Sequence, residues 1–250
     1  MTTDKKIAAF FDIDGTLART SLMIDHFLRL VKNEVIRENI WVNDIKPLYD
    51  EYNKRHLDYD NYLDAVTGVY TETLKGIKHD FIDYVAQQVI EQNADIVYTY
   101  TRSRIRWHKA QGHLTFFISG SPDFLVRHMA KKYDVTDFQG TIYHVNENDE
   151  FTGEYTKMWD SISKMSMMHS FDEIYGIDFK NSYAYGDTNG DISMLQFVGH
   201  PVVINPTKKL LEFIQSDEDL SSKIEIVVER KDVVYKLPPD VQTLDTATLL

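Results

Sequence analysis

The sequence predicts an α/β fold: a parallel sheet covered by helices on both faces, with a helical domain inserted after the first strand. Three observations lead to this prediction. Four short apolar runs lack the alternation of half-exposed strands, helical periodicity fills the segments between them, and the long segment 12–113 separates the first two runs. Continuous apolar runs are typical of strands buried on both faces of a parallel sheet. A connection of this length exceeds what one crossover needs, which favours an inserted domain.

Each apolar run ends in polar or glycine residues. The four runs are residues 7–11 before Asp12, 114–118 before Ser119, 182–185 before Gly186 and Asp187, and 201–204 before Asn205. In open α/β sheets, ligands bind outside the carboxyl ends of the strands. We therefore expect Asp12, Ser119 and Asp187 to lie together in one crevice.

The inserted segment is predicted to be helical. Apolar residues recur at helical spacing in three stretches, residues 20–36, 61–70 and 79–92. Thr20 or Ser21 is suited to cap the first of these helices. We assign residues 19–97 to a helical cap domain, and residues 1–18 and 98–250 to the main domain.

Two further segments are predicted to extend the sheet. Residues 141–155 have the pattern of a hairpin that turns near Asn148 and Asp149. Residues 223–240 are expected to add one or two edge strands. The sheet would then be wider than its four apolar runs alone.

Composition limits the classes of function. The 250 residues are 43% hydrophobic, which is ample for a sizeable core, and 39 acidic residues against 27 basic ones give a formal charge of -12. An acidic surface argues against a nucleic-acid or anionic-membrane partner. The absence of cysteine excludes disulfides and thiolate metal sites. No apolar stretch approaches the ~18 residues of a membrane span, so we expect a cytoplasmic protein.

Two carboxylates follow the first strand, at Asp12 and Asp14. Residues two apart on a strand point the same way, and at ~4 Å with an effective dielectric of ~20 their repulsion is about 4 kcal/mol. A divalent cation would relieve this repulsion, and hard oxygen ligands favour Mg²⁺. Asp187 supplies a third carboxylate from another strand. Gly15 then permits a tight turn, and Thr16 offers a hydroxyl at the same edge.

An anion site is predicted beside these carboxylates. Ser119 and Gly120 end a strand and are followed by a helix for which Ser121 is a suitable N-cap, and helix N-termini with nearby hydroxyls attract anions. Asp191 lies one helical turn after Asp187, where it could orient a metal-bound water or a lysine. Asn189 is a candidate cap for the short helix there.

These motifs, in this order, resemble those of the haloacid dehalogenase superfamily of phosphohydrolases. "DIDGT" (12–16) is similar to the first motif, Ser119 to the second and "GDTNGD" (186–191) to the fourth, while a lysine is the third. The stretches "ISGSPDFLV", "FTGEYTKMWDSISK" and "YAYGDTNGDISMLQFVGHPVVINP" resemble the phosphoserine-phosphatase-like branch, subfamily IB. This resemblance implies a Rossmann-like core with an inserted C1-type helical cap.

The resemblance also implies a role for each motif residue. Asp12 would be the nucleophile that forms an aspartyl-phosphate, and Asp14 the general acid and base. Asp12, the backbone carbonyl of Asp14, and Asp187 would hold Mg²⁺. The phosphoryl oxygens would be bound by Thr16, Ser119, the Gly120 amide and Lys164. The implied activity is that of a phosphatase acting on a small phosphorylated metabolite.

Two lysines compete for the third motif, Lys157 and Lys164. Spacing from "FTG" and to Gly186 fits Lys164 better within that branch, although Ser163 stands where a glycine usually precedes the lysine. Both remain candidates at this point.

The substrate is left open. Ser21 occupies the position at which phosphoserine phosphatases carry a cap glutamate that binds the substrate amine. We therefore expect a small phosphomonoester other than phosphoserine. Phosphoryl transfer to another acceptor, phosphonate hydrolysis and a phospho-accepting regulatory domain remain alternatives. Oligomeric state cannot be predicted from this sequence.

Overall fold

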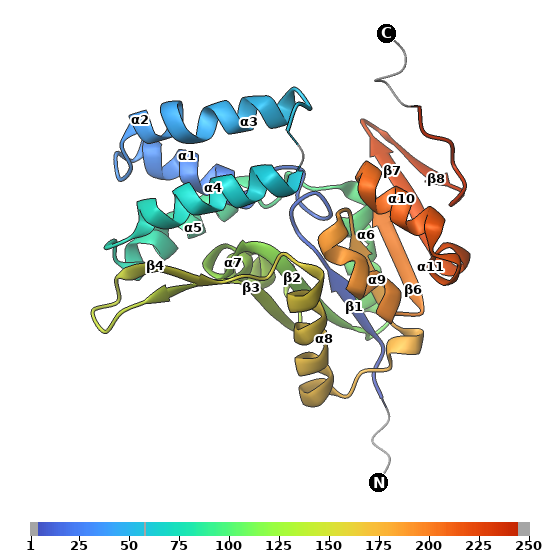
Figure 1. Ribbon diagram of the computed structural model, residues 1–250. Helices are drawn as coiled ribbons and strands as arrows, with labels where there is room; N and C mark the ends of the chain where they lie inside the picture. Colours follow the sequence, from blue (N-terminus) through green and yellow to red (C-terminus); the bar gives the residue numbers. More distant parts are fainter. Residues whose placement is uncertain (1–4, 58, 245–250) are drawn as a thin grey trace.

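The structure, a computed structural model, describes residues 5–57 and 59–244 (Figure 1). An eight-stranded sheet in the order β4-β3-β2-β1-β5-β6-β7-β8 forms its centre. The strands are β1 (Ala8–Phe11), β2 (Leu114–Pro122), β3 (Asp137–Val145), β4 (Phe151–Thr156), β5 (Tyr183–Gly186), β6 (His200–Ile204), β7 (Glu225–Arg230) and β8 (Val233–Leu237).

The four predicted apolar runs form adjacent parallel strands in the middle of this sheet, β2, β1, β5 and β6. In β1, Phe10 pairs with Phe116 on one side and with Ala184 on the other. The predicted hairpin is β3 and β4, paired antiparallel, and the predicted edge strands are β7 and β8. The expected α/β fold with a parallel sheet is confirmed, and the two antiparallel edge strands extend it.

Helices cover both faces of the sheet because successive strand residues point to opposite faces. Phe11 belongs to one apolar cluster with residues of α6 (Thr99–Ala110) and α7 (Asp123–Tyr133). Phe10 belongs to a second cluster on the other face. That face is covered by α8 (Ser161–Tyr175), α9 (Ile192–Phe197), α10 (Lys208–Ser216) and α11 (Glu218–Lys223).

The segment between β1 and α6 is helical, as predicted. Its elements are α1 (Leu22–Lys32), α2 (Glu38–Ile40), η1 (Trp41–Ile45), α3 (Lys46–Asn53), α4 (Tyr59–Leu74) and α5 (His79–Asn93). They form a layer above the β3–β4 hairpin in Figure 1. The helices between residues 38 and 53 fell outside the three stretches with clear periodicity.

The inserted helices are joined closely to the sheet. The loop between α4 and α5 exchanges backbone hydrogen bonds with β4: the Gly76 amide donates to the Phe151 carbonyl, and the Phe151 amide donates to the Ile77 carbonyl. One apolar cluster contains both Phe11 of β1 and Tyr70 of α4. Because no break in packing marks a boundary, the division at residues 19 and 97 stays a prediction.

None of the helices in the described part of the chain combines the length and apolar character needed to cross a membrane.

Candidate active site

A tight turn follows β1 and places the first motif. The carbonyl of Ile13 accepts hydrogen bonds from the amides of Thr16, Leu17 and Ala18, which closes the turn. Gly15 has φ +84°, a left-handed conformation that glycine adopts readily, and a Cβ there would lie 2.2 Å from Oδ2 of Asp187. Glycine therefore allows this turn to approach the carboxylate that follows β5.

Lys164 lies between two buried carboxylates. Its Nζ is 2.8 Å from Oδ1 of Asp12 and 2.6 Å from Oδ1 of Asp191. The exposed fractions of Asp12, Lys164 and Asp191 are 6%, 2% and 0%. Lys157 instead pairs with Asp160 at 2.6 Å, with 55% of its side chain exposed. Of the two candidate lysines, the structure brings only Lys164 to Asp12.

Asp191 is oriented by the loop in which it lies. Its Oδ2 accepts hydrogen bonds from the amides of Asp187 and Thr188, each at 3.0 Å, while Oδ1 faces Lys164. Thr188 and Asp191 form a reciprocal capping box at the start of this helical segment. The expectation that Asn189 caps the helix was wrong, because the hydroxyl of Thr188 reaches the first-turn amide instead.

Thr16 makes a different contact from the one expected of a phosphate ligand. Its hydroxyl donates a 2.8 Å hydrogen bond to Oδ1 of Asp187, its side chain is fully buried, and it is not among the residues that line the cavity. The position of Thr16 favours holding Asp187 in place over binding a phosphoryl oxygen.

Asp12, Asp187 and Asp191 form a carboxylate cluster whose ligand oxygens lie within 4.8 Å of one another. Burial raises the pKa of Asp12 to about 7 against the opposing effect of Lys164, and burial followed by repulsion from Asp12 raises the pKa of Asp187 well above its usual range. One ammonium group thus faces three crowded carboxyl groups. Such an all-oxygen donor set with excess negative charge fits a divalent metal ion.

Asp14 faces away from this cluster, toward the inserted helices. Its Oδ2 accepts a 2.7 Å hydrogen bond from the hydroxyl of Ser121, and its Oδ1 accepts one of 3.3 Å from the amide of Leu22 at the start of α1. Burial raises the pKa of Asp14 to about 6, although the bond from Ser121 opposes the rise.

The prediction of Ser121 as a cap was wrong, whereas Ser21 occupies the predicted cap position without a side-chain capping bond. Ser121 is not the N-cap of α7: β2 continues to Pro122, which occupies that position without a side-chain hydrogen bond. Ser21 is at the N-cap of α1, also without a side-chain capping bond, and the carboxylate of Asp14 accepts from the first amide instead. In both cases the carboxylate of Asp14 accepts the hydrogen bond, from 107 residues away for Ser121 and from eight residues away for Leu22.

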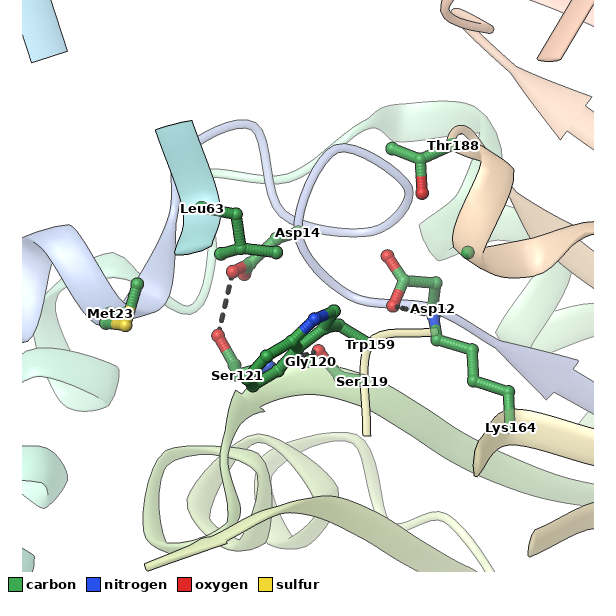
Figure 2. A pocket seen from close by; sticks show the side chains of 11 residues that line it. Asp12, Asp14, Met23, Leu63, Ser119, Gly120, Ser121, Trp159, Lys164 and Thr188 are labelled. Carbon is green, nitrogen blue, oxygen red and sulfur yellow. Dashed lines mark hydrogen bonds and ion pairs between the residues drawn. The ribbon is translucent and has the colours of Figure 1, made fainter. Parts of the chain in front are cut away.

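A cavity of about 40 Å³ opens between these groups (Figure 2). The expected site residues that line it are Asp12, Asp14, Ser119, Gly120 and Lys164. Met23, Leu63, Ser121, Trp159, Thr188 and Gly190 complete the lining. Within the described chain, the ends of β1 and β2 and the start of α8 therefore meet at one place, and Asp12 and Ser119 share the cavity as expected. Asp187 is not among the residues that line the cavity, although its carboxylate lies in the cluster with Asp12.

Sequence reasoning missed Met23, Leu63, Ser121 and Trp159 as site residues. Met23 and Leu63 lie on apolar helix faces, where they have the pattern of ordinary core residues. Trp159 lies within the stretch "FTGEYTKMWDSISK" that carries part of the family resemblance, but that resemblance implied no role for it. The only available signal was for Ser121, two residues after Ser119 on the same strand and therefore on the same face.

Comparisons with known proteins agree with this geometry. A family model for haloacid dehalogenase-like hydrolases matches residues 9–196. The chain is 26% identical over 212 residues to a phosphoserine phosphatase, SerB1, of Mycobacterium tuberculosis, covering 83% of this chain and 67% of that protein. It is 22% identical to a histidinol-phosphatase of Neisseria meningitidis, with 82% of this chain and 93% of that protein covered.

Solved structures share the fold. One is a phospho-aspartyl intermediate analogue of phosphoserine phosphatase, with a TM-score of 0.59, 18% identity, and coverage of 92% of this chain and 96% of that one. The predicted resemblance to a phosphatase of the phosphoserine-phosphatase-like type is confirmed at the level of family, fold and named relatives. The family match spans most of the chain, including the first, second and third motifs and Asp191. The protein is therefore an enzyme of the haloacid dehalogenase-like hydrolase family.

Proposed function

We propose that this hydrolase is a Mg²⁺-dependent phosphatase that cleaves a small phosphorylated metabolite through an aspartyl-phosphate intermediate. The observation that carries the proposal is the position of Asp12: buried at the end of β1, paired with Lys164 at 2.8 Å, clustered with Asp187, and exposed to the cavity. A carboxylate is a weak nucleophile, so positioning and charge neutralisation must supply most of the rate.

Asp12 and Asp14 would divide the chemistry. A carboxylate oxygen of Asp12 attacks phosphorus, the bond from phosphorus to the ester oxygen breaks, and Asp14 donates a proton to that oxygen. Water then attacks the aspartyl-phosphate, Asp14 takes its proton, and Asp12 is released with inorganic phosphate. The raised pKa of Asp14, about 6, suits a group that must both donate and accept a proton near neutral pH.

The phosphoryl oxygens would be held by donors that lie on the same side of the cavity as Asp12. Lys164 supplies a positive charge, Ser119 a hydroxyl and Gly120 a backbone amide, and all three line the cavity. Donors fixed in advance stabilise charge that develops in the transition state without reorganising. Asp191 would keep Lys164 aimed at the site, since its carboxylate is itself held by two amides.

Mg²⁺ would be held by Asp12, Asp187 and the backbone carbonyl of Asp14, with Thr16 orienting Asp187. The ion would supply positive charge that lets an anionic phosphate approach an anionic nucleophile. The alternative neutral state, in which carboxyl groups of the cluster are protonated, would deprive the enzyme of its nucleophile.

The helices of residues 19–97 would act as the cap over this site, because α1 and α4 contribute Met23 and Leu63 to the cavity wall. A cap that excludes water and contacts the leaving group is suited to small substrates. The named relatives act, by their names, on phosphoserine and on histidinol phosphate. Cytoplasmic location stays a prediction.

Release of inorganic phosphate from 4-nitrophenyl phosphate tests the proposal, measured with Mg²⁺ and with a chelator. We expect turnover in Mg²⁺ only, and its loss in Asp12→Asn. Asp80→Asn is the matched control, because 96% of that side chain is exposed. Turnover that survives in Asp12→Asn would contradict the proposal, and a stable phosphoprotein without turnover would indicate a regulatory phospho-acceptor.

A further inference from the structure

We propose that the leaving group of the substrate is an uncharged alcohol with a flat apolar portion, which packs on the indole of Trp159 and against Met23 and Leu63. The proposal rests on the proposed phosphatase function and adds to it the substrate class. It assigns Trp159 a specificity-determining role that its sequence context did not indicate.

The cavity is divided into a polar and an apolar side. Asp12, Ser119 and Lys164 form the side on which the phosphoryl group would bind, whereas Met23 and Leu63 extend from α1 and α4 on the other (Figure 2). Asp14, the proposed proton donor, stands between the two sides. In an in-line displacement the leaving oxygen departs away from the nucleophile, so the leaving group would enter the apolar side.

Two glycines allow the backbone and Cβ of Trp159 to approach the cavity closely. A Cβ on Gly120 would lie 2.7 Å from Cβ of Trp159, and a Cβ on Gly190 would lie 2.2 Å from its carbonyl oxygen. The ring of Tyr155 packs against the indole, with centroids 5.5 Å apart. A Trp side chain has only two rotatable bonds, so it loses little entropy when a flat ligand packs on it.

Charge decides against an amino-acid substrate. Among the described residues that line the cavity, the charged side chains are Asp12, Asp14 and Lys164, and Lys164 already contacts two carboxylates. A leaving-group carboxylate would find no free cation there and would face Asp14, and a buried unpaired charge is costly.

The cavity is so small that a leaving group must touch the side chains of Met23, Leu63 and Trp159 directly. Its volume of about 40 Å³ corresponds to roughly three water positions, or about the size of a phosphoryl group. Any leaving group must therefore displace or pack on the apolar side chains that close the cavity. Met23 is unbranched and can adjust its shape, whereas the indole of Trp159 is planar and keeps its shape.

Three alkyl monoesters with the same reaction at phosphorus test the proposal: benzyl phosphate, propyl phosphate and O-phosphoserine. We expect kcat/KM to fall in that order, with benzyl phosphate exceeding phosphoserine by at least about tenfold, the factor that a loss of 1.4 kcal/mol produces. Comparison of alkyl esters avoids the activation that an aryl leaving group would bring.

Variants of Trp159 test its contribution to substrate preference. Trp159→Ala should reduce the ratio of kcat/KM for benzyl to propyl phosphate by about three- to tenfold, chiefly through KM, and Trp159→Phe should restore most of it. The ratio is measured within one preparation, so partial unfolding does not alter it. Trp107→Ala is the matched control, since that side chain is 36% exposed on α6 and lies outside the cavity lining.

The outcomes distinguish failure of the specificity proposal from failure of the proposed phosphatase function. Mg²⁺-dependent, Asp12-dependent turnover with phosphoserine preferred, or with an unchanged benzyl to propyl ratio in Trp159→Ala, would overturn the specificity proposal and leave the phosphatase intact. Absence of Asp12-dependent turnover with all three esters and with 4-nitrophenyl phosphate would overturn both.

Discussion

Ser121 and Asp14 are 107 positions apart in the chain, yet the hydroxyl of one donates a 2.7 Å hydrogen bond to the carboxylate of the other. The same carboxylate accepts a bond from the amide of Leu22. Asp14 is thus fixed between the end of β2 and the start of α1, which is the boundary between the sheet and the inserted helices. The position of Asp14, the proposed proton donor, therefore depends on both parts of the fold.

Removal of the Ser121 hydroxyl should therefore impair catalysis more than folding. We expect Ser121→Ala to lower kcat for 4-nitrophenyl phosphate by about tenfold, the effect of losing about 1.4 kcal/mol of orientation by a hydrogen bond to a charged group. Ser103→Ala is the control, because that hydroxyl bonds an exposed helix carbonyl on α6. Equal kcat in the two variants would contradict the positioning role.

Lys164 and Lys157 should behave oppositely. Lys164→Met leaves Asp12 and Asp191 buried without their cation, and breaking a buried pair of this kind costs about 3–5 kcal/mol. Lys157→Met removes an exposed pair worth at most about 1 kcal/mol. Urea unfolding and phosphate release measure the two effects. A destabilised, inactive Lys157→Met protein would show that the wrong lysine had been chosen.

Gly15→Ala should abolish activity because the added Cβ meets the carboxylate of Asp187 at 2.2 Å. Gly112→Ala is matched to it, with φ +74° and no atom within 4 Å of the added Cβ. The control should lose only the about 1–2 kcal/mol cost of a left-handed conformation and remain active. Thermal unfolding and turnover are measured for both variants. Similar losses of activity in Gly15→Ala and Gly112→Ala would contradict the view that Gly15 is needed for its close approach to Asp187.

Mg²⁺ should stabilise the protein at the cluster that contains Asp187. At about 100 times the dissociation constant it contributes about 2.7 kcal/mol, or roughly 5–10 °C in Tm for a chain of this size. Asp187→Asn should lose this shift without being less stable in chelator, since it removes a buried repulsion. His79, Asp80 and Asp149 form a second cluster of side chains that could hold a metal ion, and a variant of that cluster is the control. If Asp149→Asn loses the shift instead, the ion binds elsewhere.

His26 should make the protein sensitive to acid. Its Nδ1 accepts from the hydroxyl of Tyr70 and its Nε2 donates to the carbonyl of Ile82, so the neutral ring is satisfied. Burial lowers the pKa of His26 from 6.5 to about 3. Between pH 6.5 and pH 3, the unfolded chain binds a proton at His26 that the folded chain does not bind. The free energy of unfolding is therefore unaffected by His26 above pH 6.5, and it falls as the pH is lowered from 6.5 toward 3.

The measurement compares urea unfolding at pH 7.5 and pH 5. At pH 5, protonation of His26 in the unfolded chain lowers the free energy of unfolding by about 2 kcal/mol. Between pH 7.5 and pH 5, wild type should therefore lose about 2 kcal/mol more stability than His26→Gln. His56→Gln, with its side chain 65% exposed, should follow the wild type. A parallel loss in His26→Gln and wild type would exclude His26 as the cause.

The sequence was most informative where local chemistry is demanding. Buried parallel strands require continuous apolar runs, and the four runs became β1, β2, β5 and β6. The carboxylates at Asp12 and Asp187 were recognisable because charges at strand ends are costly without a use. Local cap assignments failed at Ser121, whose hydroxyl bonds Asp14 instead, and at Asn189, whose neighbour Thr188 is the cap. Ser21 does occupy the N-cap of α1, but Asp14 accepts the hydrogen bond from the first amide.

What the sequence determined by itself was which strands end in carboxylate and hydroxyl side chains, since hydrophobic periodicity and strand-end polarity are properties of the local chain. Only the tertiary structure decided between Lys157 and Lys164, turned Thr16 toward Asp187, and placed Trp159, Met23 and Leu63 around one cavity. Those outcomes depend on how α8 and the inserted helices pack against the sheet, which is a matter of contacts between residues far apart in the chain.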